Sequence, residues 1–595
     1  MQKESRDGFT ALLYVGDGAI LLAFDVDVKK IDVNRLAGFS ILCQTPRAGP
    51  YPTNRYFLPN KMTFAAAASG AGNPDLGSDK APFQTFHWIH MPGAGPGRYK
   101  YTIFVRYFGG CSPSELEWGP QVTVKADLRY HGFDKMEVGF TRGYVSAQAF
   151  ADRFSNVDLR PEPRTIDYDT KPYRKAYEWL GAHARYCVVR FLEEANRWWW
   201  PRRMDVFAYD LDDPDIIKAL CKMGKRARVF LDDYTNVNAG GNPGHGPGSL
   251  EDAAAARLER AHVQVRRGHF SRFSHDKVFV LKTRNKPVKI LTGSANFTIR
   301  GLCVQSNNVL VLRNPAIARL YGQVFDEVWN NTGRLHDSGD VAAAFRKSAL
   351  SKDWHVVETQ LFGQRPKLVV AFSPHKKAKD KNDSPFTLDT IADAVKRSER
   401  AVLFAVMQSG GGSVFDALND ALANPDIYCL GVTQSQKGFN TARGDIDAED
   451  GSGSFSALGQ AIPPPFKKEW KGNEGIVIHH KFVVVDFNGK HPVVFCGSSN
   501  LAKGGEEENG DNLLAIYDAD IATCYAIEAI RLFDYYRFKI KQAHLGKGKT
   551  LALDRTASWV RPYFEEGSLK HQEREVLAGK RLKKTKKIPV SPLVH

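Results

Sequence analysis

The sequence predicts an α/β protein built of two related lobes, with a small β-sandwich domain before them. Three observations support this prediction. The same order of strands, helices and polar residues occurs twice in the chain. Strands alternate with helical segments from residue 135 onward, and residues 1–130 contain short strand-like runs. Strands that alternate with helices are typical of a sheet covered by helices. A chain of 595 residues is long enough for two or three domains.

Residues 1–130 are the first predicted domain. Clusters of Gly, Pro and Asn separate its strand-like runs, which are Leu12–Tyr14, Ala19–Asp25, Phe39–Gln44, Gln84–Ile89 and Tyr99–Tyr107. In the last run, large apolar residues recur at every second position, so that they share one face of a strand. We therefore expect an antiparallel sandwich of immunoglobulin or fibronectin type, which serves either to dock substrate or as a packing module.

Residues 131–350 and 351–595 are the two predicted lobes. In the first lobe, the segments after the run that begins at Met136 are helix Lys171–Arg190, strand Met204–Tyr209, helix Pro214–Met223 and strand Arg226–Leu231. The second lobe repeats this order with strand Leu368–Phe372, helix Leu388–Ser398, strand Val402–Met407, helix Val414–Ala423 and strand Ile427–Val432. The repeated order predicts an internal duplication.

A polar motif follows these segments in the second lobe. His479 and Lys481 stand two residues apart, so an extended strand directs both side chains to the same face. An Asn-Gly turn and a second apolar run then lead to Ser498 and Asn500. The pattern predicts a hairpin that brings a His, a Lys and an Asn to one end of a sheet.

The first lobe carries the same motif. His275 and Lys277 repeat the pair on one face, and Ser294 and Asn296 repeat the turn after a glycine. His275 and Asn296 are 21 residues apart, as are the corresponding His and Asn of the second lobe. Equal spacing of these polar residues in two apolar frames indicates a shared function for the two copies.

Two copies of His-x-Lys followed by Gly-Ser-x-Asn resemble the motifs of the phospholipase D superfamily of phosphodiesterases. The resemblance extends from about Lys135 to the C terminus. It implies that the two lobes pack about a pseudo-twofold axis and that two His, two Lys and two Asn converge on one pocket. Because both motifs lie in one chain, it also predicts a monomer.

Such a pocket suits phosphodiester chemistry. One neutral imidazole attacks phosphorus and forms a phosphohistidine, while the other protonates the departing alcohol and then activates water. Lys277 and Lys481 supply positive charge, and Asn296 and Asn500 supply amide donors for the phosphate oxygens. Imidazole suits both tasks because its ordinary pKa lies near 6.5. This chemistry requires no cofactor or metal, and we find no carboxylate cluster spaced to hold a metal.

The resemblance also implies supporting residues, and here the two copies differ. The family places an Asp five residues after the Lys, which the second lobe keeps as Asp486 and the first replaces with Lys282. The family often places an acid eleven residues after the Asn. The second lobe has Asp511 there, beside Asn512, and the first has Asn307, beside Asn308.

In the family, that later acid supports the His of the opposite lobe. Carried over, Asp511 holds His275, while His479 faces the neutral Asn307. A carboxylate fixes the tautomer of its imidazole and stabilises the cation formed after attack. We therefore expect His275 to be the nucleophile and His479 the general acid and base, with Ser294 and Ser498 among the surrounding residues.

The charge of the chain bears on its substrate. The net charge is +16 and the pI is about 9.3, which suits an anionic membrane surface or a nucleic acid. The basic segment Lys580–Lys587 is either a solvated tail or a binding element. An aromatic and basic cluster at Trp198–Arg203 suits a lipid interface, although core packing is the alternative. A phospholipid is the expected substrate, with nucleic acid as the alternative and a noncatalytic binding module as a third, disfavoured possibility.

Other features concern location and loops. The chain has no apolar run of the roughly 18–20 residues that cross a bilayer, and Asp17 and Asp25 interrupt any secretory signal pattern. Eight cysteines without a CxxC pair indicate buried free thiols and a reducing compartment. We expect a cytoplasmic or peripheral membrane protein. Glycine-rich loops at Asn238–Gly248 and Gly444–Ser454 are expected at the rim of the active site.

Overall fold

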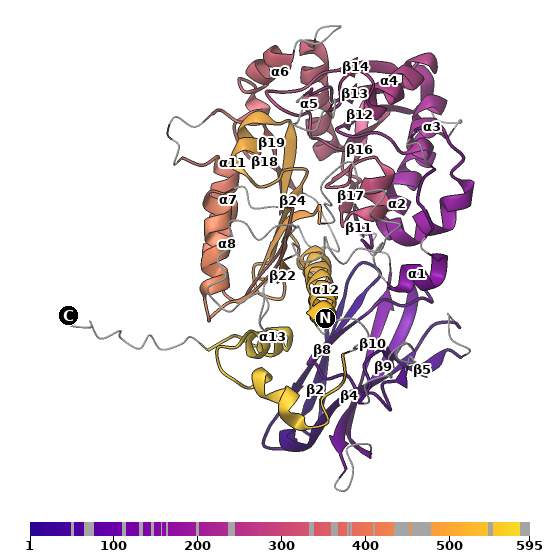
Figure 1. The fold of residues 1–595 in the computed structure, drawn as a ribbon. Helices are drawn as coiled ribbons and strands as arrows, with labels where there is room; N and C mark the ends of the chain where they lie inside the picture. The colour runs from indigo at the N-terminus through magenta and orange to yellow at the C-terminus, as the bar shows by residue number, and fades with distance from the viewer. Residues whose placement is uncertain are drawn as a thin grey trace, which may run out of the picture.

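The structure of the chain is a computed structural model. The described residues are 1–595 without 49–52, 65–75, 110–114, 130–134, 144–147, 156, 162–164, 198–201, 236–243, 333–337, 359–366, 378–379, 381–382, 408–410, 434–452, 455–477, 545–550 and 584–595. The described residues fold as a mixed α/β protein with two large sheets, two four-stranded sheets and a two-stranded pair (Figure 1), which confirms the predicted α/β class.

Two four-stranded antiparallel sheets form the N-terminal part. Their strand orders are β1-β2-β3-β8 and β10-β9-β4-β5. The strands are β1 (Gln2–Arg6), β2 (Phe9–Val15), β3 (Ile20–Val26), β4 (Leu36–Gln44), β5 (Arg55–Phe57), β8 (His87–His90), β9 (Gly97–Phe108) and β10 (Leu116–Leu128), with a further pair of β6 (Pro59–Asn60) and β7 (Leu76–Gly77). The alternating residues Tyr99, Tyr101, Ile103 and Val105 are buried in a core that both sheets share. The immunoglobulin or fibronectin type of this part stays a prediction.

A seven-stranded sheet and its helices form lobe 1. The strand order is β11-β17-β16-β15-β12-β13-β14. The strands are β11 (Met136–Phe140), β12 (Arg202–Ala208), β13 (Ala227–Leu231), β14 (Gln264–Arg267), β15 (Val278–Thr283), β16 (Lys286–Gly293) and β17 (Asn308–Leu312). The helices are α1 (Gln148–Phe154), α2 (Arg174–Ala195), α3 (Pro214–Met223), α4 (Leu250–Arg260), α5 (Pro315–Asn331) and α6 (Ser338–Phe345).

An eight-stranded sheet and its helices form lobe 2. The strand order is β18-β19-β25-β24-β23-β20-β21-β22. The strands are β18 (His355–Glu358), β19 (Lys367–Ser373), β20 (Ala401–Val406), β21 (Tyr428–Thr433), β22 (Gly453–Ser454), β23 (Lys481–Val485), β24 (Val493–Gly497) and β25 (Asp511–Tyr517). The helices are α7 (Phe386–Lys396), α8 (Ser413–Ala423), α11 (Lys503–Glu508) and α12 (Ala519–His544).

The two large sheets match strand for strand once β18 is set aside at its edge. In lobe 1, β12 pairs in parallel with β13 and antiparallel with β15. In lobe 2, β20 pairs in the same way with β21 and β23. Both sheets therefore have the topology that an internal duplication produces. The predicted helix Pro214–Met223 begins at Asp213, whose side chain caps the first turn, and ends before Gly224.

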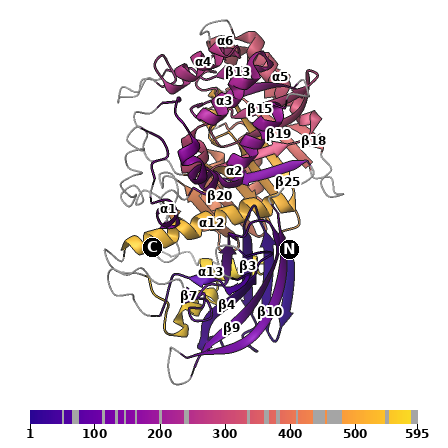
Figure 2. The same cartoon turned by 90° about the vertical axis from the view of Figure 1, so that its right-hand side faces the viewer.

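Helix α12 lies where the lobes meet the N-terminal sheets (Figure 2). Its buried face contributes Tyr525, Ile527 and Ile530 to a core that residues of both lobes and of β2 share. The phenol of Tyr525 packs edge-on against Phe140 of β11 and donates a hydrogen bond to Asn308 of β17. One helix of lobe 2 therefore fixes the strands of lobe 1 that lead to the predicted site.

The C-terminal segment returns to the N-terminal sheets. It contains the short helix η6 (Ala557–Tyr563) and α13 (Leu569–Leu577). The indole of Trp559 donates to the backbone oxygen of Leu36, and Glu573 lies 3.0 Å from the Nδ1 atom of His87. The division of the chain at residues 130 and 350 stays a proposal, because this segment shares the N-terminal core.

Two expectations from composition can be followed in the described residues. The cysteines at 43, 187, 221, 303, 429, 496 and 524 are free thiols, as predicted, and all except Cys221 are buried. Among the helices that the structure describes, none combines the length and the apolar character needed to cross a bilayer.

Candidate active site

Two short backbone contacts between the lobes bring the motifs together. His275 stands three residues before β15, and His479 stands two residues before β23. Ser274 forms a parallel bridge with Gly510, and Ile478 forms one with Ser306. In each bridge, the residue before a motif histidine pairs with the residue before Asp511 or Asn307 of the other lobe. The bridges thus place each imidazole against the opposite lobe.

His275 is held by a carboxylate of lobe 2. Its Nδ1 atom lies 2.8 Å from Asp511 Oδ1, and its side chain is buried, with the whole residue only 5% exposed. An ionised carboxylate can only accept, so Nδ1 carries the proton and Nε2 presents a lone pair. Tyr209 packs edge-on against the imidazole at 4.9 Å between ring centres. The ring is therefore fixed in one tautomer and one orientation.

His479 is held by neutral groups of lobe 1. Its Nδ1 atom lies 2.9 Å from Asn307 Oδ1 and 3.1 Å from the backbone oxygen of Ser294. The Asn307 amide cannot turn over freely, because its Nδ2 donates to the Gly301 oxygen and its Oδ1 also accepts from Ser294 Oγ. These two nearest partners of Nδ1 are acceptors, so Nδ1 carries the proton, and the lone pair of Nε2 lies toward Lys481.

Both motif lysines are buried at the same place. Lys481 Nζ donates to the backbone oxygen of His479 and lies 3.3 Å from the Nε2 atom of its ring. Lys277 Nζ donates to the backbone oxygen of His275 and stands 4.9 Å from the centre of the Tyr209 ring. Two cations buried so closely make an anion-binding site when they are charged.

The two motif asparagines have unused hydrogen-bonding capacity. Asn296 Nδ2 donates to Asp210, and the buried Oδ1 atoms of Asn296 and Asn500 accept no hydrogen bond within the described part of the chain. Buried polar atoms are nearly always paired, so orphaned atoms call for an explanation. A polar ligand supplies one, since Asn296 Nδ2 keeps a second hydrogen beside its bond to Asp210 and the Asn500 amide can turn to present its NH₂.

The electrostatics of the site explain its protonation state. Burial, with the nearby charges of Lys481, Lys277 and His275, holds the pKa of His479 well below its ordinary value. Burial also lowers the pKa of Lys277 to about 8, although Asp511 and Asp210 oppose the shift. The pKa of Asp511 is lowered by His275 and Lys277 against the effect of its burial. Charged groups of each motif thus shift the pKa values of groups in the other motif.

The middle residue of each His-x-Lys also crosses to the other lobe. Asn512 Nδ2 donates to Asp276 Oδ1 at 2.6 Å, and Asn308 Nδ2 lies 3.3 Å from His480 Nδ1. Burial raises the pKa of Asp276 to about 7, while burial lowers the pKa of His480. Asn512 and Asn308 therefore contact the middle residue of the opposite motif, next to its histidine. Sequence analysis did not predict these contacts.

The two motif serines join these contacts. Ser294 Oγ accepts from the Asn308 backbone N–H at 3.0 Å, and Ser498 Oγ accepts from that of Asn512 at the same distance. These are equivalent places in the two lobes. Contacts and electrostatic interactions thus link eleven of the predicted site residues to one another or to a shared neighbour: His275, Lys277, Ser294, Asn296, Asn307, Asn308, His479, Lys481, Ser498, Asp511 and Asn512. Asn500 lies in the turn after β24.

Asp486 and Lys282 lie elsewhere. Asp486 follows the far end of β23 and accepts hydrogen bonds from the backbone N–H groups of Arg400 and Ala401. Lys282 lies near the far end of β15 and forms an ion pair with Asp205. Neither residue reaches an imidazole. Each residue lies five positions after its motif lysine, and five residues of extended strand span more than about 15 Å. The replacement of the family Asp by Lys282 in lobe 1 therefore leaves the surroundings of the histidines unchanged.

Three further residues adjoin the site and were missed. Asp210 accepts from Asn296, and its other oxygen lies 2.8 Å from His245 Nε2. His245 Nδ1 lies 2.7 Å from Asp232, which accepts from the Ser274 backbone N–H. Both carboxylates oppose the effect of burial and raise the pKa of His245 to about 11. Asp210 and Asp232 follow the carboxyl ends of the parallel strands β12 and β13, a position from which they could have been predicted.

Several predicted features lie wholly or partly outside the described residues. Trp198–Trp200 and Pro201 do, as do residues 238–243, most of the second glycine-rich loop, and Lys584–Lys587 of the basic segment. The described end of the first loop carries His245, so this part adjoins the site as expected. The described start of the basic segment is ordered by ion pairs, since Lys580 contacts Asp25 and Arg581 contacts Glu399.

A family model described as "Cardiolipin synthase, PLD-like domain" matches residues 188–329, which contain the first motif. The match supports the resemblance of the motifs to the phospholipase D superfamily. No curated protein matches the chain.

Solved structures offer partial likenesses. The phosphatidylserine synthase of Haemophilus influenzae is 10% identical, with a TM-score of 0.39, over 66% of this chain and 90% of that one. The polyphosphate kinase of Porphyromonas gingivalis is 12% identical, with a TM-score of 0.34, over 65% and 55%. The phospholipase D family member Nuc of Salmonella typhimurium is 27% identical, with a TM-score of 0.20, over 26% and 91%. This chain thus spans about half the length of the polyphosphate kinase.

Proposed function

We propose that the protein is a phosphodiesterase of the phospholipase D type, which needs no metal for the reaction and works through a covalent phosphohistidine. The observation that carries the proposal is the crossed support of the two motif histidines. Each turns its Nε2 atom toward the site because its Nδ1 atom is held from the other lobe, by Asp511 or by Asn307. Two buried lysines beside the rings provide the charge that a phosphodiester requires.

In the first step, Nε2 of His275 attacks phosphorus and the bond to the leaving alcohol breaks. His479 donates its Nε2 proton to that alcohol, and the phosphoryl group stays on His275. In the second step, His479 removes a proton from water, the hydroxide attacks phosphorus and the P–N bond breaks. Asp511 suits the nucleophile because a carboxylate stabilises the positive charge that His275 acquires on attack.

The low pKa of His479 sets a condition on this assignment. The group is neutral in the free site, so it can serve as an acid only if the bound phosphodiester raises its pKa by offsetting Lys277 and Lys481. The reverse assignment, with His479 as nucleophile and His275 as acid, requires a smaller change, because burial also lowers the pKa of His275 but Asp511 opposes that shift. We retain the first assignment for its carboxylate, and the trapping experiment below separates the two.

Two features support a phospholipid as the substrate. The matching family model bears the name of cardiolipin synthase. In addition, Trp118 is 54% exposed and packs with Phe57 and Phe104 on the outer surface of the N-terminal sheets. Exposed aromatic side chains suit the interface of a bilayer. We therefore propose hydrolysis or transfer of phosphatidyl groups at a membrane surface.

A nucleic acid is the alternative substrate. The net charge of +16 supports it, since phosphate-backbone binding depends on an excess of Lys and Arg. Tyr209, Tyr234 and Phe273, which form a chain of edge-on contacts beside His275, could also stack on bases. The chemistry at phosphorus is the same for both substrates.

One experiment tests both the chemistry and the substrate. Purified protein is offered phosphatidylcholine vesicles and, separately, plasmid DNA, with and without EDTA. We expect choline release that EDTA does not abolish during the assay, and that His275→Ala and His479→Ala each abolish. His491→Ala, an exposed histidine in the turn after β23, is the matched control and keeps full activity. DNA nicking with the same pattern would assign a nuclease, and activity in both alanine variants would refute the proposed chemistry.

Trapping identifies the nucleophile. Labelled substrate is mixed with each variant and the reaction is stopped in alkali, because phosphohistidine is labile in acid. His479→Ala should retain label on the protein and His275→Ala should not. The opposite result would assign attack to His479.

A further inference from the structure

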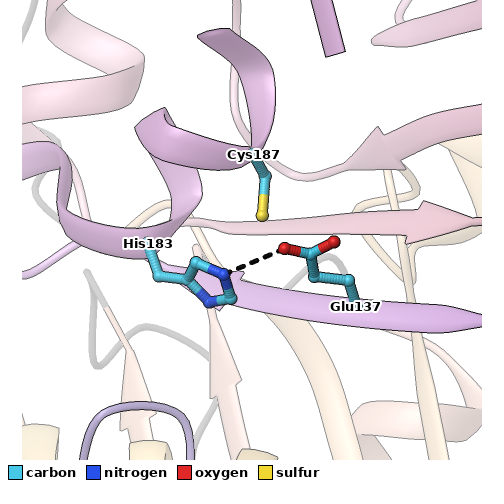
Figure 3. A group of neighbouring side chains, drawn as sticks. All are labelled: Glu137, His183 and Cys187. Atoms are coloured by element: carbon cyan, nitrogen blue, oxygen red, sulfur yellow. Dashed lines mark hydrogen bonds and ion pairs between the residues drawn. The ribbon is translucent and has the colours of Figure 1, made fainter. Parts of the chain in front are cut away.

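A second cluster of reactive side chains lies on lobe 1, apart from the phosphodiester site. Figure 3 shows Glu137 from β11 and His183 and Cys187 from α2, which point toward one another. Their donor atoms all lie within 4.8 Å of one another. All three residues are buried, with exposed fractions of 2–4%.

The sequence builds this cluster through two local features. His183 and Cys187 are four residues apart, so one face of α2 presents both side chains. Gly139 lets that face approach β11 closely, because a Cβ atom there would lie 2.8 Å from the backbone carbon of His183 and the nitrogen of Ala184. The helix also has a kink at Ala182, where φ is +42° and ψ is −133°. A non-glycine residue in that conformation is strained, so the surroundings of His183 must hold it in place.

We propose that this cluster binds one zinc ion through Glu137 Oε1, His183 Nε2 and Cys187 Sγ. A carboxylate, an imidazole and a thiolate are the three ligand types that zinc takes in proteins, usually as a tetrahedron. With metal–ligand distances of about 2.0 Å, tetrahedral nitrogen and oxygen ligands stand about 3.3 Å apart. The observed distance between His183 Nε2 and Glu137 Oε1 is 3.2 Å.

The groups around the cluster are those that a zinc site needs. Asp17 Oδ1 lies 2.7 Å from His183 Nδ1, which fixes the ring so that Nε2 faces Glu137. Metal-bound histidines almost always have such a partner on the other nitrogen. Arg190 and Arg313 donate to Glu137 Oε2, at 2.8 and 2.6 Å, which leaves Oε1 directed at the cluster. Their positive charges are offset by Asp17, Glu137 and a Cys187 thiolate, so zinc adds little excess charge.

A cavity gives the ion a route to the cluster. Asp17 and His183 line a cavity of about 590 Å³, which also reaches Arg142, Cys524 and Arg531. The cavity lies where α2, α12 and the turn between β2 and β3 meet. Of the three ligands only His183 lines this space, so a water molecule that completes the tetrahedron would reach the zinc from the side of His183.

The proposed zinc has a structural role. Asp17 belongs to the N-terminal sheets and also accepts from the Phe140 backbone N–H, so the ion would tie that part to β11 and α2. Beyond Phe140, Thr141 exchanges hydrogen bonds with Asn307, the partner of His479. The zinc therefore stabilises the rear of the phosphodiester site and takes no part in the reaction.

Metal content tests the proposal on the full-length protein. Protein purified without chelator is incubated with zinc chloride, dialysed, and measured by elemental analysis. We expect about one zinc per chain, and none retained by Cys187→Ala, which leaves the Asp17–His183–Glu137 contacts in place. Cys221→Ala, at a partly exposed cysteine on α3, is the matched control and retains zinc. Asp17→Asn should weaken zinc binding by about 10–100-fold.

Cobalt(II) gives a second readout that does not depend on activity. Substituted protein should show the near-ultraviolet thiolate-to-cobalt absorption band, and this band should vanish in Cys187→Ala and persist in Cys221→Ala. The proposal is overturned if the protein retains no zinc, if Cys187→Ala retains as much as the control, or if the cobalt protein lacks the thiolate band. These results are independent of which phosphodiester is cleaved, since catalysis is not measured.

Discussion

The two halves of the candidate site share a framework and differ in the charge behind the motif histidine. In each half a motif histidine lies against the opposite lobe, its lysine donates to its backbone, and a serine accepts from the Asn beside position 307 or 511. Behind His275 stands the carboxylate of Asp511, whereas behind His479 stands the amide of Asn307. The framework therefore orients both rings equally, and the difference in charge divides the roles.

That division follows from what each role demands. A nucleophilic imidazole gains positive charge as it bonds to phosphorus, and a carboxylate on Nδ1 stabilises that charge. An acid must lose a proton during the reaction, and a neutral partner makes the loss easier. Asp511 and Asn307 thus match attack by His275 and protonation by His479. Variants that make the halves more alike, or further apart, test this interpretation.

The largest effect is expected from Asp511→Asn, which makes the two halves alike. The amide can still accept from His275 Nδ1, but it no longer stabilises the imidazolium and can turn to donate. An Asp-to-Asn change behind a catalytic histidine lowers kcat by about 10⁴-fold in a serine protease, and we expect a loss of roughly 10³–10⁴-fold with little change in KM. Steady-state kinetics with a phospholipid substrate measures it. A loss below tenfold would mean that Asp511 does not support the nucleophile.

The middle residues of the motifs give the second comparison. Burial raises the pKa of Asp276 to about 7 from an ordinary value of 3.8, whereas His480 at the equivalent place has a lowered pKa. A carboxyl with a raised folded-state pKa binds its proton more tightly in the folded protein. Its contribution to stability is therefore present at low pH and is lost as the pH rises from about 4 to about 7.

Asp276→Asn should remove the loss of stability that occurs as the pH rises. We expect the variant to exceed the parent in free energy of unfolding by about 2–4 kcal/mol at pH 8, and the gain should disappear toward pH 4. Urea titrations at several pH values measure it, with Asp393→Asn on the exposed surface of α7 as the control. A gain that is equal at pH 4 and pH 8 would show that Asp276 is not protonated in the folded protein.

These residues also show where prediction from sequence succeeds. The motif pairs and their spacing are properties of neighbouring residues, so His275, Lys277, His479 and Lys481 could be placed on paired strand ends. The same holds for α3, where Asp213 and Gly224 mark both ends locally. The support of His275 by Asp511 was predicted as well, but only through the resemblance to a family.

Contacts between distant segments could not be predicted in this way. Nothing near Asp276 indicates that Asn512 will donate to it, because the lobes must first pack. His245 pairs with Asp210 and Asp232 across a glycine-rich loop whose composition suggests only a turn. The return of α13 to the N-terminal sheets likewise depends on Glu573 meeting His87, which lies hundreds of residues away in the chain.

Asn307→Asp places a carboxylate behind His479 as well. Its expected effect on kcat is smaller than that of Asp511→Asn, and the direction of the shift in the pH profile is informative. The new charge raises the pKa of His479, by about one unit or tenfold in equilibrium, while the donor to the Gly301 oxygen is lost. If His479 is the acid, the alkaline limb of the kcat profile moves to higher pH. If His479 is the nucleophile, the acid limb moves instead, since the ring must then be neutral. The pH dependence of kcat thus distinguishes the two assignments by which limb shifts.

The smallest expected effects come from the two serines, and they should be unequal. Ser294 Oγ donates to Asn307 Oδ1, so Ser294→Ala leaves that oxygen with His479 alone. Ser498 Oγ instead lies 3.4 Å from Asp276 and also lowers the pKa of Asp511 by hydrogen bonding. A hydrogen bond to a charged group contributes about 1.5–3 kcal/mol and a neutral one about 1 kcal/mol. Ser498→Ala should therefore reduce kcat by about tenfold or more and Ser294→Ala by about fivefold. Equal losses of kcat would indicate that both serines act only by accepting from the backbone N–H groups of Asn308 and Asn512. The groups that the two hydroxyls contact, Asn307 in one half and the carboxylates in the other, would then make no difference to kcat.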